Sequence, residues 1–191
     1  MISLIRDYSG SGVAEGTAIT IEGNELYATG TTASALGNPG NLFLLKYDLA
    51  GNLAWTRTWG GSASEGASSV AVFGSSVFAS SSTDSYATWL RAGVTVKHSI
   101  EGVLDTTNSP QGWWTKFDGD TSYHGYNYAL GIAFDELGNL YVVGVSERAF
   151  NNLWSYVEMY NPLGVKQWHQ NYGAFGVGGN GSNGLVRSGT S

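Results

Sequence analysis

The sequence predicts an all-β protein that repeats one four-stranded unit three times. Apolar runs of about four to eight residues with period two follow one another along the chain, and clusters of Gly, Asn, Ser and Asp separate them. Two sequence blocks also recur in the same phase in every copy. No segment keeps a helical period for the roughly ten residues that a helix needs.

The composition fits many tight turns between short strands. Gly accounts for 28 of the 191 residues, and aromatic and charged residues account for 13% each. That charged share is about half of the usual one. Low charge together with many Trp and Tyr is the opposite of a disordered composition. The length suffices for a substantial core, which buries about 70% of the surface of the unfolded chain.

Charge and hydropathy exclude several classes of partner. The net charge is −6 and the nine Lys and Arg are scattered, whereas a nucleic-acid surface needs them clustered. No apolar run reaches the roughly eighteen residues of a membrane span. The start, MISLIRDYSG, lacks the basic and apolar regions of a secretion signal. Without Cys, we expect no disulfide and no thiolate metal site. The Ser-, Thr- and Gly-rich, Lys-poor composition favours an extracellular or cell-surface location.

The first recurring block carries a glycine turn followed by spaced aromatic residues. Its copies read FLLKYDLAGNLAW (43–55), VTVKHSIEG (94–102) and YVEMYNPLGVKQWHQNYG (156–173). These copies align Gly51 with Gly102 and Gly164, which we interpret as turn glycines that need positive φ. The corresponding aromatic positions are Trp55, Trp113 and Trp168, and then Trp59, Phe117 and Tyr172.

The second recurring block has the alternation of a strand hairpin. Its copies read TAITIEGNELYATG (17–30), SSVAVFGSSVFASS (68–81) and LGIAFDELGNLYVVG (130–144). The corresponding positions are Ile19, Val70 and Ile132, and then Tyr27, Phe78 and Tyr141. The repeat is 51 residues long and then 62, and two insertions explain the excess, one at 105–112 and one within 120–127.

Each unit therefore contains four short strands. In the first unit we expect them at about 15–21, 25–31, 41–48 and 52–59. Four antiparallel strands in about fifty residues are typical of a β-propeller blade. The predicted blades are 15–59, 66–117 and 129–172, within a single repeat domain of residues 1–191. A blade cannot bury both faces alone, so neighbouring blades must stack on it.

The two ends of the chain are out of step with the blades. Residues 4–8 align with the outermost strand at 55–59, and residues 185–187 fit an innermost strand. The segments 1–8 and 173–191 therefore predict a split, incomplete fourth blade. Unclosed blades expose apolar faces and strand edges. We expect self-association, or further blades of a longer parent chain.

A family resemblance rests on these residues. The pattern K-Y-D-x-x-G-N-x-x-W-x-x-x-W-G-G lies at 46–61, E-G-x-x-x-V-A-V at 65–72, and [YF]-x-x-[GS] at 78–81. Together they resemble the bacterial SBBP-type β-propeller repeat, although the second unit departs from it at 97–99. The spacing is also similar to the pyrroloquinoline-quinone-type repeat, but Gly-Gly after the second aromatic favours the first family. The resemblance implies a scaffold of surface and secreted proteins, usually with more blades.

Most residues with chemical potential fit structural roles better. The repeated aromatics form either a sugar-stacking platform or the packing between blades, and their recurrence favours packing. His98 and His169 fall on different strands, which argues against a shared metal site. Asp118 and Asp120 offer too few oxygens for calcium. No nucleophile elbow or Ser/His/Asp constellation emerges. We therefore expect no catalytic residue, no metal and no cofactor.

The better candidate is the segment that breaks the repeat. An aromatic insertion joins an outer strand to the next inner strand, on the face where ligands usually enter a propeller. Its residue types suit contact with a carbohydrate or peptide, although a decorated loop that packs on a neighbour is at least as good an explanation. The candidate ligand-binding residues are Tyr123, His124, Tyr126, Asn127 and Tyr128.

Three functions follow, in order of preference. The first is a non-enzymatic extracellular scaffold or assembly module. The second is a carbohydrate- or peptide-binding module that uses the 120–128 loop. The third is a fragment of an enzyme whose essential residues lie in blades outside this sequence.

Overall fold

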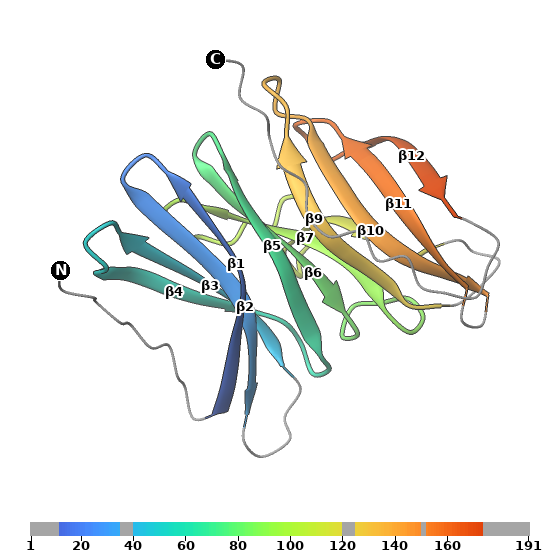
Figure 1. Cartoon of the computed structure of the whole chain (residues 1–191), viewed down its shortest axis with the longest axis horizontal. Coiled ribbons are helices and arrows are strands. Elements are labelled where there is room, and N and C mark those ends of the chain that lie inside the picture. Colours follow the sequence, from blue (N-terminus) through green and yellow to red (C-terminus); the bar gives the residue numbers. More distant parts are fainter. Residues whose placement is uncertain (1–11, 35–39, 120–124, 150–151, 174–191) are drawn as a thin grey trace.

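The computed structural model describes residues 12–34, 40–119, 125–149 and 152–173. These residues form twelve β-strands in three antiparallel sheets of four strands (Figure 1). The first sheet contains β1 (Gly12–Glu22), β2 (Glu25–Ser34), β3 (Asn41–Asp48) and β4 (Leu53–Trp59). The second contains β5 (Glu65–Phe73), β6 (Ser76–Thr83), β7 (Ala92–Ser99) and β8 (Trp113–Phe117). The third contains β9 (Asn127–Phe134), β10 (Leu140–Ala149), β11 (Asn152–Tyr160) and β12 (Lys166–Tyr172).

The three predicted four-stranded units are confirmed, and in each sheet the strands neighbour one another in chain order. Ring closure and the split fourth blade stay predictions, because residues 1–11 and 174–191 lie outside the described residues. None of the described segments is a helix long and apolar enough to cross a bilayer.

One turn recurs between the third and fourth strands of each sheet. Gly51, Gly102 and Gly164 have φ of 82°, 84° and 77°, the left-handed region that glycine adopts without strain. Each donates its backbone N–H to the carbonyl three residues earlier, over 2.8–3.0 Å. The prediction of turn glycines is thus confirmed, and the turn fixes the register of the outer hairpin.

The sheets stack face to face, and each has two different faces. Its aromatic face packs on the next sheet and carries, in the first sheet, Tyr27, Trp55 and Trp59. Its aliphatic face packs on the preceding sheet and carries, in the second sheet, Val70, Ala79 and Val96. The second and third sheets repeat this contact through Phe78 and Trp114 on one side and Ile132, Phe134 and Tyr156 on the other.

Hydrogen bonds from the indole groups tie one sheet to the next. Trp55 Nε1 donates to the Ile100 carbonyl over 3.0 Å, and Trp59 Nε1 donates to the Gln111 carbonyl over 2.7 Å. Trp59 is only 4% exposed. Packing between sheets, rather than a free stacking platform, is therefore the role of these two tryptophans.

In the second sheet the aromatic alignment was wrong by one residue. The sequence predicts that Trp113 replaces Trp55, but a register shift between Thr95 and Val96 turns Trp113 toward the first sheet. There its ring lies 5.7 Å from that of Tyr86. Trp114 takes the predicted place, because its ring neighbours Phe78 as Trp55 neighbours Tyr27. Phe117 does occupy the position of Trp59, opposite the equivalent residue of the third strand.

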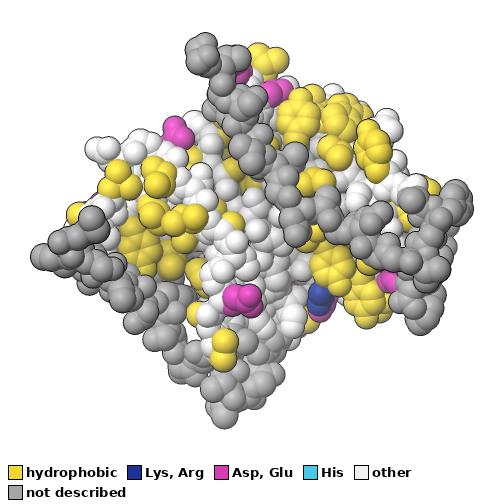
Figure 2. Space-filling view, in the orientation of Figure 1, with side chains coloured by type: hydrophobic (Ala, Val, Ile, Leu, Met, Phe, Trp, Pro, Cys, Tyr) yellow, Lys and Arg dark blue, Asp and Glu magenta, His cyan; other side chains and the backbone are white. Residues whose placement is uncertain are grey.

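Hydrophobic side chains are unevenly distributed on the outside of the stack. In Figure 2 they gather over the first sheet on the left and the third sheet on the right, whereas the centre is mostly polar side chains and backbone. The middle sheet has a neighbour on each face, but the outer two have one described neighbour each.

His98 is buried between the first two sheets and makes stability depend on pH. It replaces Tyr47 and Tyr160 of the other repeats and is 2% exposed. Burial, assisted by the positive charge of Arg57, lowers its pKa from 6.5 to about 4. The folded state therefore holds His98 neutral at a pH where the unfolded chain protonates it.

We expect mild acid to destabilise the protein through His98, at a pH above that at which the Asp and Glu side chains of the protein titrate. Stability is fully present above pH 6.5 and is lost as the pH falls toward 4, by about 2 kcal/mol between pH 6.5 and pH 5. Urea unfolding at pH 7 and pH 5 measures this loss. His98→Tyr, which copies the other repeats, and His98→Leu should both remove it. An unchanged loss in both variants would contradict the assignment.

Candidate functional site

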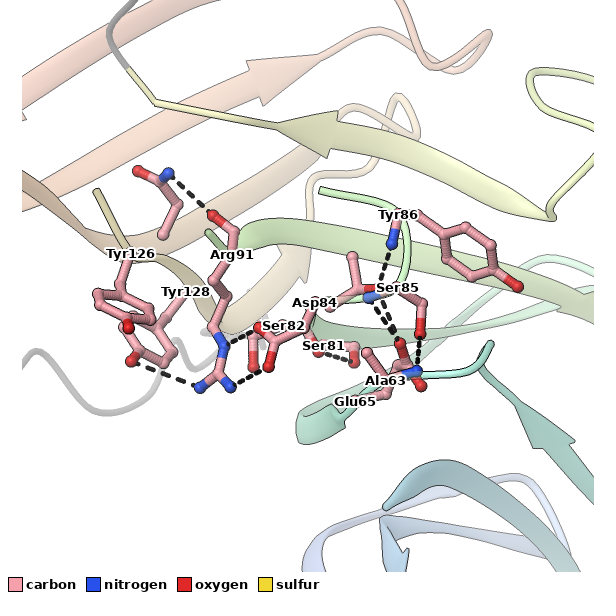
Figure 3. A network of polar contacts seen from close by, with 12 residues as sticks. Ala63, Glu65, Ser81, Ser82, Asp84, Ser85, Tyr86, Arg91, Tyr126 and Tyr128 are labelled. Atoms are coloured by element: carbon pink, nitrogen blue, oxygen red, sulfur yellow. Dashed lines mark hydrogen bonds and ion pairs between the residues drawn. The ribbon is translucent and has the colours of Figure 1, made fainter. Parts of the chain in front are cut away.

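The candidate site lies between the second and third sheets, on the side of the molecule where their inner strands β5 and β9 begin. It combines the β6–β7 loop with the last residues of the β8–β9 connection, which meet at a parallel bridge between Arg91 and Tyr126. Figure 3 shows Arg91 between Asp84 on one side and the rings of Tyr126 and Tyr128 on the other. We call Arg91, Asp84, Tyr126 and Tyr128 the arginine–tyrosine cluster.

Arg91 organises this cluster. Its Nε and Nη2 atoms donate to the two carboxylate oxygens of Asp84, each over 2.6 Å, in a bidentate ion pair. Hydrogen bonding to Asp84 raises the pKa of Arg91, so the guanidinium stays charged. The guanidinium carbon lies 5.2 Å from the ring centre of Tyr128 and 5.9 Å from that of Tyr126, within the range of cation–π contact.

The cluster presents an aromatic surface to solvent. Tyr126 is 42% exposed, whereas Tyr128 is half-buried and Nη1 of Arg91 approaches its hydroxyl at 3.4 Å. The ion pair leaves Arg91 little capacity for an external anion, since Asp84 already neutralises it. A fixed ring with a neutralised charge beside it suits stacking against the apolar face of a sugar or a peptide group.

Asn127 lies beneath the cluster and positions it. Its side chain is buried, and its backbone N–H and Nδ2 both donate to the Arg91 carbonyl, over 3.2 and 3.0 Å. Its Oδ1 accepts a hydrogen bond of 2.7 Å from the Ser146 hydroxyl. The two bonds to Arg91 join the first strand of the third sheet to the loop of the second, and the bond from Ser146 holds Asn127 within its own sheet.

Glu65 holds the same place one repeat earlier. It pairs with Thr83 as Asn127 pairs with Ser146, and its Oε1 accepts the Thr83 hydroxyl at 2.9 Å. Its backbone N–H donates to the Gly40 carbonyl over 2.7 Å, where Gly40 corresponds to Arg91. In both repeats the residue at the start of the inner strand thus joins two units through its backbone N–H, and its buried polar side chain bonds the neighbouring strand of its own sheet; we call this arrangement the repeated lock.

The structure brings together three of the five predicted ligand-binding residues. Tyr126 and Tyr128 share the cluster, and Asn127 supports it from below. Tyr123 and His124 lie outside the described residues. Sequence reasoning missed Arg91 and Asp84, because the first unit has the uncharged Gly40 and Ala33 at the same repeat positions and no repeated signal marks the pair.

The other candidate ligands are not brought together. Among the described residues, no group of three or more His, Asp and Glu side chains is placed to hold a metal ion. His98 is on β7 and His169 on β12. Asp118 accepts hydrogen bonds from the Thr88 backbone and hydroxyl, both over 2.9 Å, and pairs with Lys116. Asp120 lies outside the described residues.

Glu158 is a second polar group that breaks the repeat inside a core. It and its cross-strand partner His169 replace Leu45 and Thr56 of the first sheet. The Glu158 side chain is buried, and its Oε1 lies 3.0 Å from His169 Nδ1 and 3.2 Å from Lys166 Nζ. Its Oε2 accepts the Tyr160 hydroxyl, and burial, with this carboxylate nearby, raises the pKa of Tyr160. Its oxygens are therefore engaged within the third sheet.

Comparison with known proteins gives only distant structural likeness. No family model and no curated protein matches the chain. Among solved structures, the native arabinanase Arb43A of Bacillus subtilis is similar, with a TM-score of 0.46 and 17% sequence identity. The similarity covers 84% of this chain and 57% of the arabinanase chain.

Proposed function

We propose that this chain is a non-enzymatic extracellular or cell-surface scaffold made of SBBP-type propeller blades, which associates with itself or belongs to a larger surface protein. The observation that supports this function is the repeated contact between sheets. Recurring residues hold one unit on the next. Trp55 and Trp59 donate to carbonyls of the following unit, and the backbone N–H groups of Glu65 and Asn127 donate to carbonyls of the preceding one. The same contact can add further sheets, either from a longer chain or from another copy.

Assembly is the property that a scaffold of this kind must have. Three stacked sheets have two outer faces, and further blades or further chains would complete the ring. Light scattering after size-exclusion chromatography, over a wide range of concentration, measures the mass of the particle. A defined assembly supports the proposal. A monomeric mass at every concentration would contradict self-association.

A second candidate function is carbohydrate or peptide binding at the arginine–tyrosine cluster. The exposed ring of Tyr126, held in place by Arg91, favours it. A glycan array and a peptide array should each be probed with the unaltered protein.

We expect Tyr126→Ala to weaken any such binding by about tenfold, because it removes the stacking surface. Tyr126→Phe keeps the ring and should retain the binding. This second function would be excluded if the unaltered protein bound nothing on either array, or if Tyr126→Ala bound as tightly as the unaltered protein.

A further inference from the structure

Equivalent residues on the aliphatic faces differ sharply in exposure. Val70 of the second sheet and Ile132 of the third are 7% and 3% exposed, because the preceding sheet covers them. Ile19 is their counterpart in the first sheet and is 63% exposed. Ile21, the next residue along that face, is also exposed. The inner strand of the first sheet therefore keeps the residues of a covered face without a described sheet to cover it.

The aromatic faces show the opposite gradient along the chain. Trp59 is buried in the first sheet, but Tyr172, at the same position of the third sheet, is 67% exposed. Trp168 is 39% exposed. The Tyr141 and Trp168 rings lie 6.1 Å apart at 60°, and the buried Tyr27 and Trp55 rings lie 6.1 Å apart at 56°. The third sheet thus presents the ring pair in the arrangement that the first junction uses.

The two inner junctions define what such a ring pair packs against. The indole of Trp55 lies against Gly102, and the indole of Trp114 lies against Gly164, at the same glycine of the next turn. A Cβ atom at either glycine would come within 3.0 Å of the indole. Each junction thus pairs an indole with the turn glycine of the next sheet. Among the described residues, the equivalent indole of Trp168 and the equivalent glycine Gly51 are not paired in this way.

The first sheet has a hollow at Gly51 that is large enough to admit an indole. It has a volume of about 770 Å³ and is lined by Gly51, Leu49, Ile19, Leu45 and Tyr47, among other residues. Leu49 corresponds to Ile100, whose carbonyl accepts the hydrogen bond of Trp55. The first and third sheets lie at opposite ends of the stack, so the matching faces of one chain point away from each other.

From these observations we infer that the aromatic face of the third sheet of one chain packs on the aliphatic face of the first sheet of a second copy. Trp168 enters the hollow at Gly51 and donates its Nε1 hydrogen to the Leu49 carbonyl of that copy. This inference rests on the proposed scaffold function and names its partner. The contact is head-to-tail, so it either closes a ring or makes an open filament.

The three sheets of the described residues select a ring of two chains. Closed propellers have about four to eight blades, and six is the only multiple of three in that range. Two copies joined at both ends give a ring of six sheets, in which each outer face is covered. The exposed side chains of the two outer faces, Ile19, Ile21, Trp168 and Tyr172, then have the environment of their counterparts at the inner junctions.

Light scattering tests the contact with two variants, one for each face. Trp168→Ala removes the indole, and Ile19→Glu places a charge on the receiving face. We expect each to convert the dimer to a monomer at concentrations where the unaltered protein is dimeric. Val103→Glu is the matched control, because Val103 is exposed on the β7–β8 connection of the middle sheet, which forms neither outer face. This variant should remain dimeric. Circular dichroism should show that all three variants are folded.

Mixing the two variants identifies a head-to-tail contact. The Trp168→Ala chain keeps an intact first sheet, and the Ile19→Glu chain keeps an intact third sheet. Together they form one unaltered junction, so the mixture should contain dimers that neither variant forms alone. Dimers that survive both substitutions would overturn the inference and leave the scaffold proposal standing. A monomeric unaltered protein would overturn the inference together with self-association of the scaffold, and a trimer or filament would overturn the six-sheet ring.

Discussion

Replacement of Trp59 with alanine is expected to lower the free energy of unfolding by about 4 kcal/mol, as is typical for deletion of a buried tryptophan. The ring is buried between the first two sheets, with its centre 5.4 Å from that of Tyr86. The substitution leaves a cavity and also removes the donor to the Gln111 carbonyl. Urea unfolding with linear extrapolation measures the loss. Trp59→Phe fills part of the cavity and should recover part of it.

Tyr172 provides the matched control because it occupies the same repeat position in the third sheet. Its side chain is exposed, so Tyr172→Ala should change the free energy of unfolding by less than about 0.5 kcal/mol. Both substitutions should be measured in the Ile19→Glu background, where association between chains does not contribute. Equal losses at the two positions would mean that the repeat position, and not the neighbouring sheet, determines the contribution of the aromatic ring.

The sheets and their turns could be predicted from the sequence because short-range physical chemistry specifies them. Gly51 and its two counterparts recur at positions where the backbone needs positive φ, and this marks each outer hairpin. Alternation of apolar residues then assigns strand faces, so that Ile19 and Val70 were correctly placed in equivalent positions. Nothing in these signals depends on residues distant in the chain.

The misplaced Trp113 shows where such reasoning ends. A one-residue register shift moves the side chains beyond it to the opposite face of the sheet. No residue type in the inserted segment 105–112 indicates from the sequence that the shift occurs. Two adjacent tryptophans, Trp113 and Trp114, satisfy the aromatic pattern equally well. Only the contacts with the neighbouring sheets decide between them.

The candidate site could be predicted in part. Tyr126 and Tyr128 are visible in the sequence as aromatic residues in an insertion, but their partners Arg91 and Asp84 come from a loop about forty residues earlier. Asn127 looked like a ligand-binding residue because it lies in that insertion. Alignment with Glu65 was the available signal that it is part of a repeated lock.

Glu65 is the member of this lock whose loss should cost most. Its Oε1 accepts the Thr83 hydroxyl and the Ser85 backbone N–H, and its Oε2 accepts the Gly61 backbone N–H over 3.2 Å. The side chain is buried, so water cannot readily replace it. We expect Glu65→Ala to lower the free energy of unfolding by about 3 kcal/mol, because three donors lose their acceptor in a dry environment.

The third sheet suggests how the loss should be repaired. It makes the same lock with an amide and a serine, Asn127 and Ser146, instead of a carboxylate and a threonine. The double variant Glu65→Asn/Thr83→Ser should therefore be more stable than Glu65→Ala, although the shorter amide no longer reaches both Gly61 and Ser85. Urea unfolding compares the two variants with the unaltered protein. If Glu65→Ala were as stable as the unaltered protein, the buried carboxylate would not stabilise the start of β5 and the segments around it. If the double variant were no better than Glu65→Ala, the two locks would not be equivalent.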